Sequence, residues 1–216
     1  MNNLLNPVNA LRTLAVFSAL PILMRVATQG DITGLFLLWN LFLAWLPLPL
    51  ARGFASTLAI TSKERIMMAS VFFLAWLFFF PNAPYIVTDL IHLEGEHDPA
   101  YWLEATVLFA LATTGMFTGM YSMYIIHRSL QKLTGLILSW LIMGGCAFLS
   151  GFGIYLGRIQ RWNTWDIITR PLALLKGAYH GAQETIAIEM TIGFGLLIII
   201  CYFMLISLVG YEKRTS

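Results

Sequence analysis

The hydrophobic positions of this chain form long continuous runs, separated by short polar segments. Six of these runs are almost free of charged side chains and are about twenty residues long, the length that an α-helix needs to cross a bilayer. The strands of a membrane barrel would instead alternate apolar and polar residues over about ten positions. The pattern therefore predicts an all-α transmembrane bundle with six spans.

The expected spans follow the charge-poor runs. They are Ala10–Ala27, Ile32–Leu50, Ile66–Phe80, Ala105–Ile126, Leu133–Leu156 and Met190–Tyr211. Pro47 and Pro49 are expected to end the second span, because proline removes a backbone donor and clashes with the preceding turn. We expect a single integral-membrane domain over residues 1–216.

Composition supports the membrane assignment. Hydrophobic residues make up 58% of the chain and charged residues 11%, with a mean hydropathy of +0.75. Soluble domains carry roughly a quarter charged residues, so one water-soluble core could not hide this much apolar surface. No basic segment precedes the first apolar run, which favours an uncleaved anchor over a signal peptide. Cys146 and Cys201 lie in apolar runs, where thiols behave as small hydrophobes.

The basic residues predict the orientation. With a cytoplasmic N-terminus, eight Lys and Arg residues fall on the inner side and five on the outer side. The inner ones are Arg12, Arg52, Lys63, Arg65, Arg128, Lys132, Lys213 and Arg214, and the outer ones are Arg25, Arg158, Arg161, Arg170 and Lys176. Positive charge favours the cytoplasmic side, so we expect a multi-pass protein of the inner or plasma membrane with both termini inside. Four of the five outer basic residues share one segment, which calls for a compensating interaction.

The first polar segment on the expected outer face is PNAPYIVTDLIHLEGEHDP, residues 81–99. Its two prolines predict a helix break within Phe80–Tyr85, with Ala83 displaced from the α region. A short helix should follow and present Asp89 and His92 on one face, because they are three residues apart. Ionisable groups at membrane depth are candidates for a functional site. The acidic and histidine side chains of Glu94, Glu96, His97 and Asp98 come next.

The second polar segment is GRIQRWNTWDIITRP, residues 157–171. It combines arginines with tryptophans, then adds Asn163 and Asp166. Arginine forks recognise carboxylate or phosphate, and tryptophan is typical of the headgroup level. We expect the two polar segments to meet, with Asp89 or His92 in contact range of Arg158, Arg161 or Asn163.

The strings PNAPYIVTDLIHL and GRIQRWNTWD resemble those of an uncharacterised bacterial integral-membrane family, domain of unknown function 1361. The resemblance extends over nearly the whole chain. It implies a small polytopic membrane protein and no particular activity, because the family has no assigned one. No functional residue is carried over from it.

Three classes of function remain open. The first is an enzyme or binding protein that acts at the outer face on lipid-linked or anionic substrates, with Asp89 and His92 as catalytic or ligand groups. Its substrate-binding residues would be Asn82, Tyr85, Arg158, Arg161, Asn163 and Asp166. The second is a small transporter or channel, and the third is an accessory or structural membrane subunit. The structural alternative makes Asp89–His92 an interfacial polar pair and the arginines members of ion pairs.

The remaining patterns are less specific. Gly115 and Gly119, and likewise Gly153 and Gly157, have the spacing of close helix contacts. His127 is expected at the inner interface, where amphipathic rings settle. As partners we expect the lipid bilayer and lipid headgroups or an anionic ligand, and no nucleic acid. Asp89, His92, His97, His180 and Glu184 are suitable metal ligands, yet no specific metal motif is present. Neither a cofactor, a metal nor an oligomeric state can be assigned.

Overall fold

The computed structural model describes residues 6–58, 64–93 and 101–215, and these ranges are helical apart from short connections. The helices are α1 (Pro7–Gln29), α2 (Leu35–Trp45), α3 (Pro47–Thr57), α4 (Arg65–Phe79), α5 (Asn82–Tyr85), α6 (Tyr101–Thr134), α7 (Leu136–Arg158), α8 (Asp166–Thr169), α9 (Pro171–Gly181) and α10 (Thr185–Thr215), with the 3-10 helix η1 (Ile86–His92) after α5. The chain is therefore all-α, as predicted.

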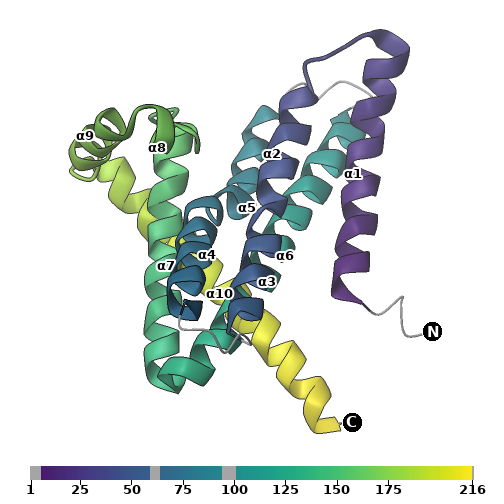
Figure 1. The fold of residues 1–216 in the computed structure, drawn as a ribbon. Coiled ribbons are helices and arrows are strands. Elements are labelled where there is room, and N and C mark those ends of the chain that lie inside the picture. Colours follow the sequence, from purple (N-terminus) through teal and green to yellow (C-terminus); the bar gives the residue numbers. More distant parts are fainter. Residues whose placement is uncertain (1–5, 59–63, 94–100, 216) are drawn as a thin grey trace.

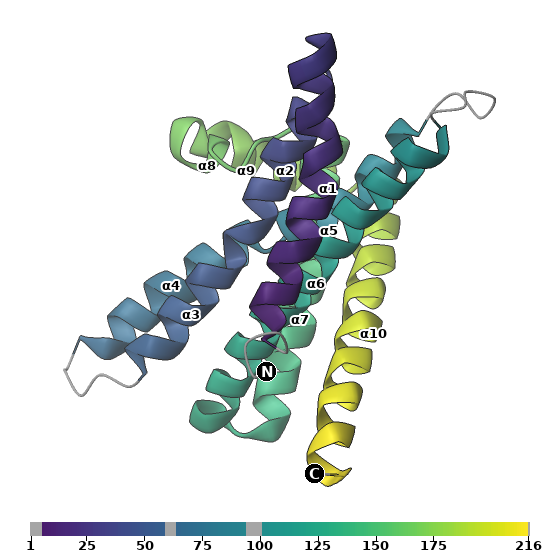
Figure 2. The same ribbon diagram turned by 90° about the vertical axis from the view of Figure 1, so that its right-hand side faces the viewer.

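Within the described ranges, six segments are long and apolar enough to cross a membrane. They are Pro7–Gln29, Leu35–Thr57, Arg65–Ile91, Tyr101–Thr134, Leu136–Arg158 and Thr185–Val209. α1 begins and α10 ends toward the same end of the bundle, and α8 and α9 lie at the other end (Figure 1, Figure 2). We call the latter the α8 end and the former the terminal end. The predicted number of spans is confirmed.

Pro47 and Pro49 do not end the second span, so that prediction was wrong. Pro47 occupies the first turn of α3, and the helical path continues from α2 through Leu46 to Thr57. Proline is tolerated at this position because the amide of the first turn has no partner within its own helix. Leu46, which joins the two helices, keeps its backbone in the α region at φ −59° and ψ −35°.

The third span breaks where the prolines predicted. α4 ends at Phe79, a single short turn forms α5, and the chain then narrows into η1, which contains Asp89 and ends at His92. The predicted displacement of Ala83 was wrong, because Ala83 is buried inside α5. The chain accommodates Pro84 by changing from α to 3-10 hydrogen bonding rather than by leaving the helical region.

Neighbouring helices hold this broken segment through glycines. Four of them, two in α6 and two in α7, face it: Gly115, Gly119, Gly153 and Gly157. A Cβ atom at Gly115 would lie 2.5 Å from the carbonyl oxygen of Ala83, and one at Gly153 would lie 2.8 Å from the Pro81 ring. The predicted close helix contacts are thus confirmed, and they are intramolecular. Their purpose is to let α6 and α7 approach the α5 backbone.

At the terminal end, α6, α7 and α10 meet in a polar cluster inside an apolar core. His127 accepts at Nδ1 from the Tyr202 hydroxyl at 2.7 Å, and its Nε2 lies 3.2 Å from the Ser139 hydroxyl oxygen. Ser139 donates its own hydrogen to the Leu136 carbonyl, so the Nε2–H of a neutral imidazole must be the donor to Ser139. His127 is only 4% exposed, so its predicted interfacial position was wrong. We call His127, Ser139 and Tyr202 the histidine cluster.

Candidate functional site

A charged cluster joins α2, η1 and α7 at the α8 end. Asp89 is 1% exposed, and its two carboxylate oxygens accept from different helices. Oδ2 accepts from the Asn40 amide at 2.8 Å, and Oδ1 accepts from Arg158 Nη1 at 3.2 Å. The predicted meeting of the two polar segments is confirmed by the Asp89–Arg158 contact. We call Asn40, Tyr85, Asp89 and Arg158 the charged cluster.

Arg158 is held on several sides. Its Nη2 donates to the Thr88 carbonyl at 2.8 Å, and Nη1 also reaches the Tyr85 hydroxyl at 3.5 Å. The guanidinium carbon lies 5.8 Å from the centroid of the Tyr85 ring, within the range of a cation–π contact. Arg158 therefore bonds both to a backbone carbonyl near the start of η1 and to the Asp89 carboxylate, and its side chain is 20% exposed.

The loop after α7 crosses over the broken segment. Asn82 donates to the Phe79 carbonyl at 3.0 Å and accepts from the Thr164 hydroxyl at 3.3 Å. Trp165 meets Trp39 of α2 edge-on, with ring centroids 6.2 Å apart. These two contacts tie the loop to α5 and α2. Asn82 thus bonds across the turn between α4 and α5, and it also lines the space below the loop.

Asp166 has a local role in this loop. Its carboxylate accepts from the Asn163 backbone amide at 2.8 Å and from Arg170 Nη2 at 2.9 Å. The Asn163 amide and then Arg170 hold the pKa of Asp166 below its ordinary value. Asp166 is 1% exposed, so these bonds order the start of α8 and account for its carboxylate without a ligand. Four residues separate Asp166 from Arg170, the spacing of neighbours on one helix face.

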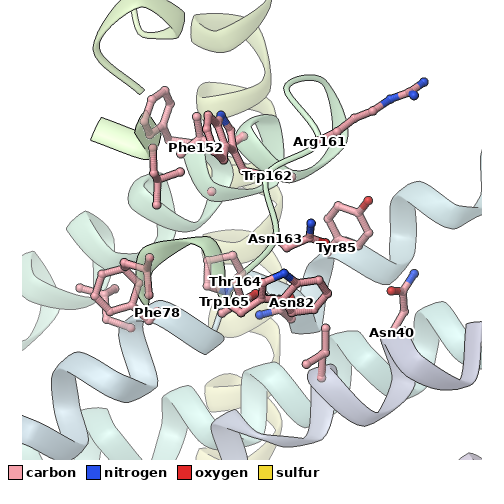
Figure 3. A pocket seen from close by; sticks show the side chains of 18 of the residues that line it. Asn40, Phe78, Asn82, Tyr85, Phe152, Arg161, Trp162, Asn163, Thr164 and Trp165 are labelled. Carbon is pink, nitrogen blue, oxygen red and sulfur yellow. Dashed lines mark hydrogen bonds between the residues drawn. The ribbon is translucent and has the colours of Figure 1, made fainter. Parts of the chain in front are cut away.

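A cavity of about 570 Å³ opens beneath the loop, between α2, the α4–α5 break and α7. Its polar wall contains the predicted residues Asn82, Tyr85, Arg161 and Asn163, together with Asn40 and Thr164 (Figure 3). Its apolar wall is formed by Leu43, Leu77, Phe78, Leu149, Phe152 and Leu156. Asp89 and Arg158 are not among the described residues that line it, but they bind two that do, Asn40 and Tyr85.

Arg161 lies at the rim of this cavity in an unusual backbone conformation. Its φ of +59° is the only positive value at a non-glycine residue in the described ranges. The side chain extends away from the other labelled side chains (Figure 3), and it is exposed. Among the described residues Arg161 forms no hydrogen bond or ion pair, so its guanidinium is available to a ligand. A left-handed residue of this kind costs of order 1–3 kcal/mol and is concentrated at functional sites.

Several candidate ligands lie outside the described residues. The backbone of His92 ends η1, but its side chain and residues Glu94–Asp98 are outside the described part. Among the residues that are described, no three His, Cys, Asp or Glu side chains gather as a metal site would require. His180 and Glu184 are exposed at α9 and its end. The predicted catalytic roles of Asp89 and His92 therefore stay predictions.

Residues 39–201 match the family described as Protein of unknown function (DUF1361). The chain belongs to this family. The DUF1361 match contains the whole charged cluster and every residue that lines the cavity, and it begins within α2. Neither the curated proteins nor the solved structures with which the chain was compared contain a match. The predicted resemblance is confirmed, and it assigns no activity.

Sequence reasoning missed Asn40, Trp39 and Phe78. Asn40 is the only strongly polar residue within the apolar run Leu35–Leu50, and an amide at that depth was the signal that could have identified it. Phe78 carried no signal, because it lies among other aromatic residues of the same run. Its place in the cavity wall depends on where α7 packs, which local sequence does not specify.

Proposed function

We propose that this DUF1361 protein binds an amphiphilic, anionic or lipid-linked ligand in the cavity beneath the 159–165 loop, at the outer face of the membrane. The observation that carries this proposal is the division of the cavity wall. Amide, hydroxyl and guanidinium groups line the α8 end, and aliphatic and aromatic side chains line the rest. A ligand with a polar headgroup and an apolar chain matches both parts.

The apolar part of the cavity wall also fits a ligand that enters from the bilayer. Phe78 and Leu149 line the cavity, and they are 52% and 56% exposed. Both belong to segments long and apolar enough to span the membrane, so their exposed surface faces lipid. An acyl or isoprenoid chain would reach the cavity sideways, between α4 and α7, while its headgroup stays at the interface.

The polar groups then have distinct roles. Arg161 at the rim would pair with a phosphate or carboxylate, since its fork is available for two parallel hydrogen bonds. Asn163, whose side chain is exposed, would add an amide donor and acceptor. Asp89 and Arg158 would act as positioning residues, because they orient Asn40 and Tyr85.

The ligand-binding test uses the full chain in phosphatidylcholine nanodiscs that contain a phosphatidylglycerol with a photoreactive acyl chain. Light-induced adducts should concentrate on the cavity wall, including Phe78 and Leu149. Arg161→Gln should lower labelling there by about threefold to tenfold, the range for one charge-assisted bond. Lys176→Gln is the matched control, because Lys176 is exposed on α9 and does not line the cavity. Equal labelling of Phe203, which is exposed on α10, would contradict a defined site.

The outer-face assignment has its own test. Reporter fusions after Ser216 should give a cytoplasmic signal, and fusions at Gly95 should give a signal from the opposite side. The reverse pattern would place the cavity at the cytoplasmic face and overturn this part of the proposal. The binding test above does not depend on that result.

A transporter is the second candidate, and one feature favours it. Thr114, Thr118 and Ser122 form a buried row on α6 at intervals of four residues. The hydroxyl of Thr118, and that of Ser150 in the neighbouring α7, have no hydrogen-bond partner among the described residues. A row of hydroxyls that leads inward from the α8 end could line a polar path. Flux of a small solute into liposomes that is reduced by Thr118→Val, and unchanged by Thr113→Val at a half-buried position outside the row, would favour this function.

A further inference from the structure

A second cavity lies at the α8 end between α1, α2 and α6, and it shares no lining residue with the first. Its volume is about 750 Å³. Phe17, Leu20 and Met24 of α1 form one wall, and each is about half exposed. α1 rises roughly 10 Å between Phe17 and Met24, enough to lie along several methylene groups of an acyl chain.

The mouth of this cavity carries charges of both signs. Arg25 Nη2 donates to Glu104 Oε1 at 2.9 Å, and the two side chains are 39% and 36% exposed. A guanidinium has five N–H donors and a carboxylate has two oxygens, so this single bond leaves both groups able to bind a ligand. The pair is therefore a combined donor and acceptor at the level of the span ends.

Asp31 adds a second carboxylate to the same mouth. Its Oδ1 accepts from both the hydroxyl of Thr33, at 2.6 Å, and the Thr33 backbone amide, at 2.9 Å. The hydroxyl contact is the main reason that the pKa of Asp31 lies below its ordinary value. The described residues of the lining thus present one guanidinium and two carboxyl groups.

A headgroup that carries a phosphate and a primary ammonium matches this set of charges. The phosphate would accept from Arg25, and the ammonium would donate to Glu104 and Asp31. An anionic headgroup without an amine would place its charge beside two carboxylates, and a quaternary ammonium has no N–H to donate. We propose that the cavity between α1, α2 and α6 binds an aminophospholipid, with its acyl chain along α1 and its headgroup between Arg25, Glu104 and Asp31.

The test compares phosphatidylethanolamine, phosphatidylcholine and phosphatidylglycerol with identical acyl chains, each titrated into the detergent-purified full chain and followed by native mass spectrometry. Phosphatidylethanolamine should bind about threefold to tenfold more tightly than either of the others, the range for one or two charge-assisted bonds. Equal affinities for the three lipids would overturn the proposal.

Two substitutions locate the site. Glu104→Gln keeps the side-chain size and should abolish the preference for phosphatidylethanolamine over phosphatidylcholine. Arg25→Gln should weaken the binding of both lipids. Arg12→Gln, an exposed residue near the other end of α1, is the matched control and should change neither. A preference that survives Glu104→Gln would contradict the proposed headgroup contacts. Arg161→Gln should leave this preference unchanged, so the outcome is independent of the first cavity.

Discussion

The charged cluster and the histidine cluster each fasten three structural elements, one near each end of the bundle. The charged cluster joins α2, η1 and α7 through an ion pair, and it adjoins a cavity that opens between helices. The histidine cluster joins α6, α7 and α10 through neutral groups. Aromatic side chains pack around it, and the Trp140 ring meets the His127 ring edge-on, with ring centroids 4.7 Å apart.

The difference lies in what each cluster leaves available. In the histidine cluster, every donor has an acceptor within the protein. Tyr202 donates to His127, His127 donates to Ser139, and Ser139 donates to the Leu136 carbonyl. In the charged cluster, Asn40 and Tyr85 still present surface to the cavity. Polar groups inside a span that are fully paired with one another indicate a structural role, and those that also line a cavity indicate a binding role.

The largest expected effect is the loss of one partner of the ion pair. Asp89→Ala would leave Arg158 and Asn40 without a carboxylate, at a cost on the order of 3–5 kcal/mol in the free energy of unfolding. Steric trapping or reversible unfolding in detergent would measure it. Arg158→Ala with the double variant completes the cycle, and strictly additive effects would show that the two residues are not coupled. Glu104→Ala is the control, since its partly exposed pair contributes only about 0–1 kcal/mol.

The next largest loss of stability is expected from substituting the glycines that pack against the α5 segment. Gly115→Ala would place a methyl group against the Ala83 carbonyl and should destabilise the protein by about 1–3 kcal/mol through overpacking. Gly144→Ala in α7 is the matched control, because nothing lies within 4 Å of its Cβ position. That control should be neutral or stabilising by up to about 1 kcal/mol, since alanine favours a helix over glycine. Equal melting temperatures for the two variants would contradict the close contact.

The histidine cluster should respond more weakly. Tyr202→Phe removes the donor to His127 Nδ1 and should cost about 1–2 kcal/mol, the penalty for one buried unsatisfied acceptor. Because the groups are neutral, the loss should not depend on salt concentration. Unfolding in low and high salt would check this, and a strong salt dependence would show that the imidazole is charged.

The smallest effect is a pH dependence at α8. The folded pKa of Asp166 lies below its ordinary value of 3.8, so its bonds stabilise the fold above about pH 4 and are lost as the pH falls through the folded pKa. The stability difference between the native protein and Asp166→Asn should be constant from pH 7 to 5 and shrink at lower pH. A difference that changes between pH 7 and 5 would indicate another titrating group.

Local sequence was sufficient for the spans and for one contact between them. Continuous apolar runs identify membrane helices because lipid leaves few other structures available, and the break at Pro81 follows from a missing donor. The Asp89–Arg158 pair was predictable because opposite charges on one face of the membrane attract across a low-dielectric boundary. These inferences use only the type and position of residues along the chain.

The histidine cluster and the cavity could not be predicted in the same way. His127 and Tyr202 are 75 positions apart, and no charge or spacing links them. The cavity exists because α2, the α4–α5 break and α7 leave space between them, which depends on the packing of side chains from three separate runs. The second span was misjudged for a related reason, because the effect of Pro47 depends on its position within a turn.

The glycine contacts around α5 have a consequence for how the chain is made. The two helices that hold this segment come later in the sequence, and Arg158 follows Asp89 by 69 positions. During synthesis, Asp89 therefore emerges long before its counter-charge, and it cannot enter hydrocarbon alone at acceptable cost. It must wait in water or inside the insertion machinery until α7 has been threaded. The docking of the α5 segment between α6 and α7 can then follow only after α7 has been inserted.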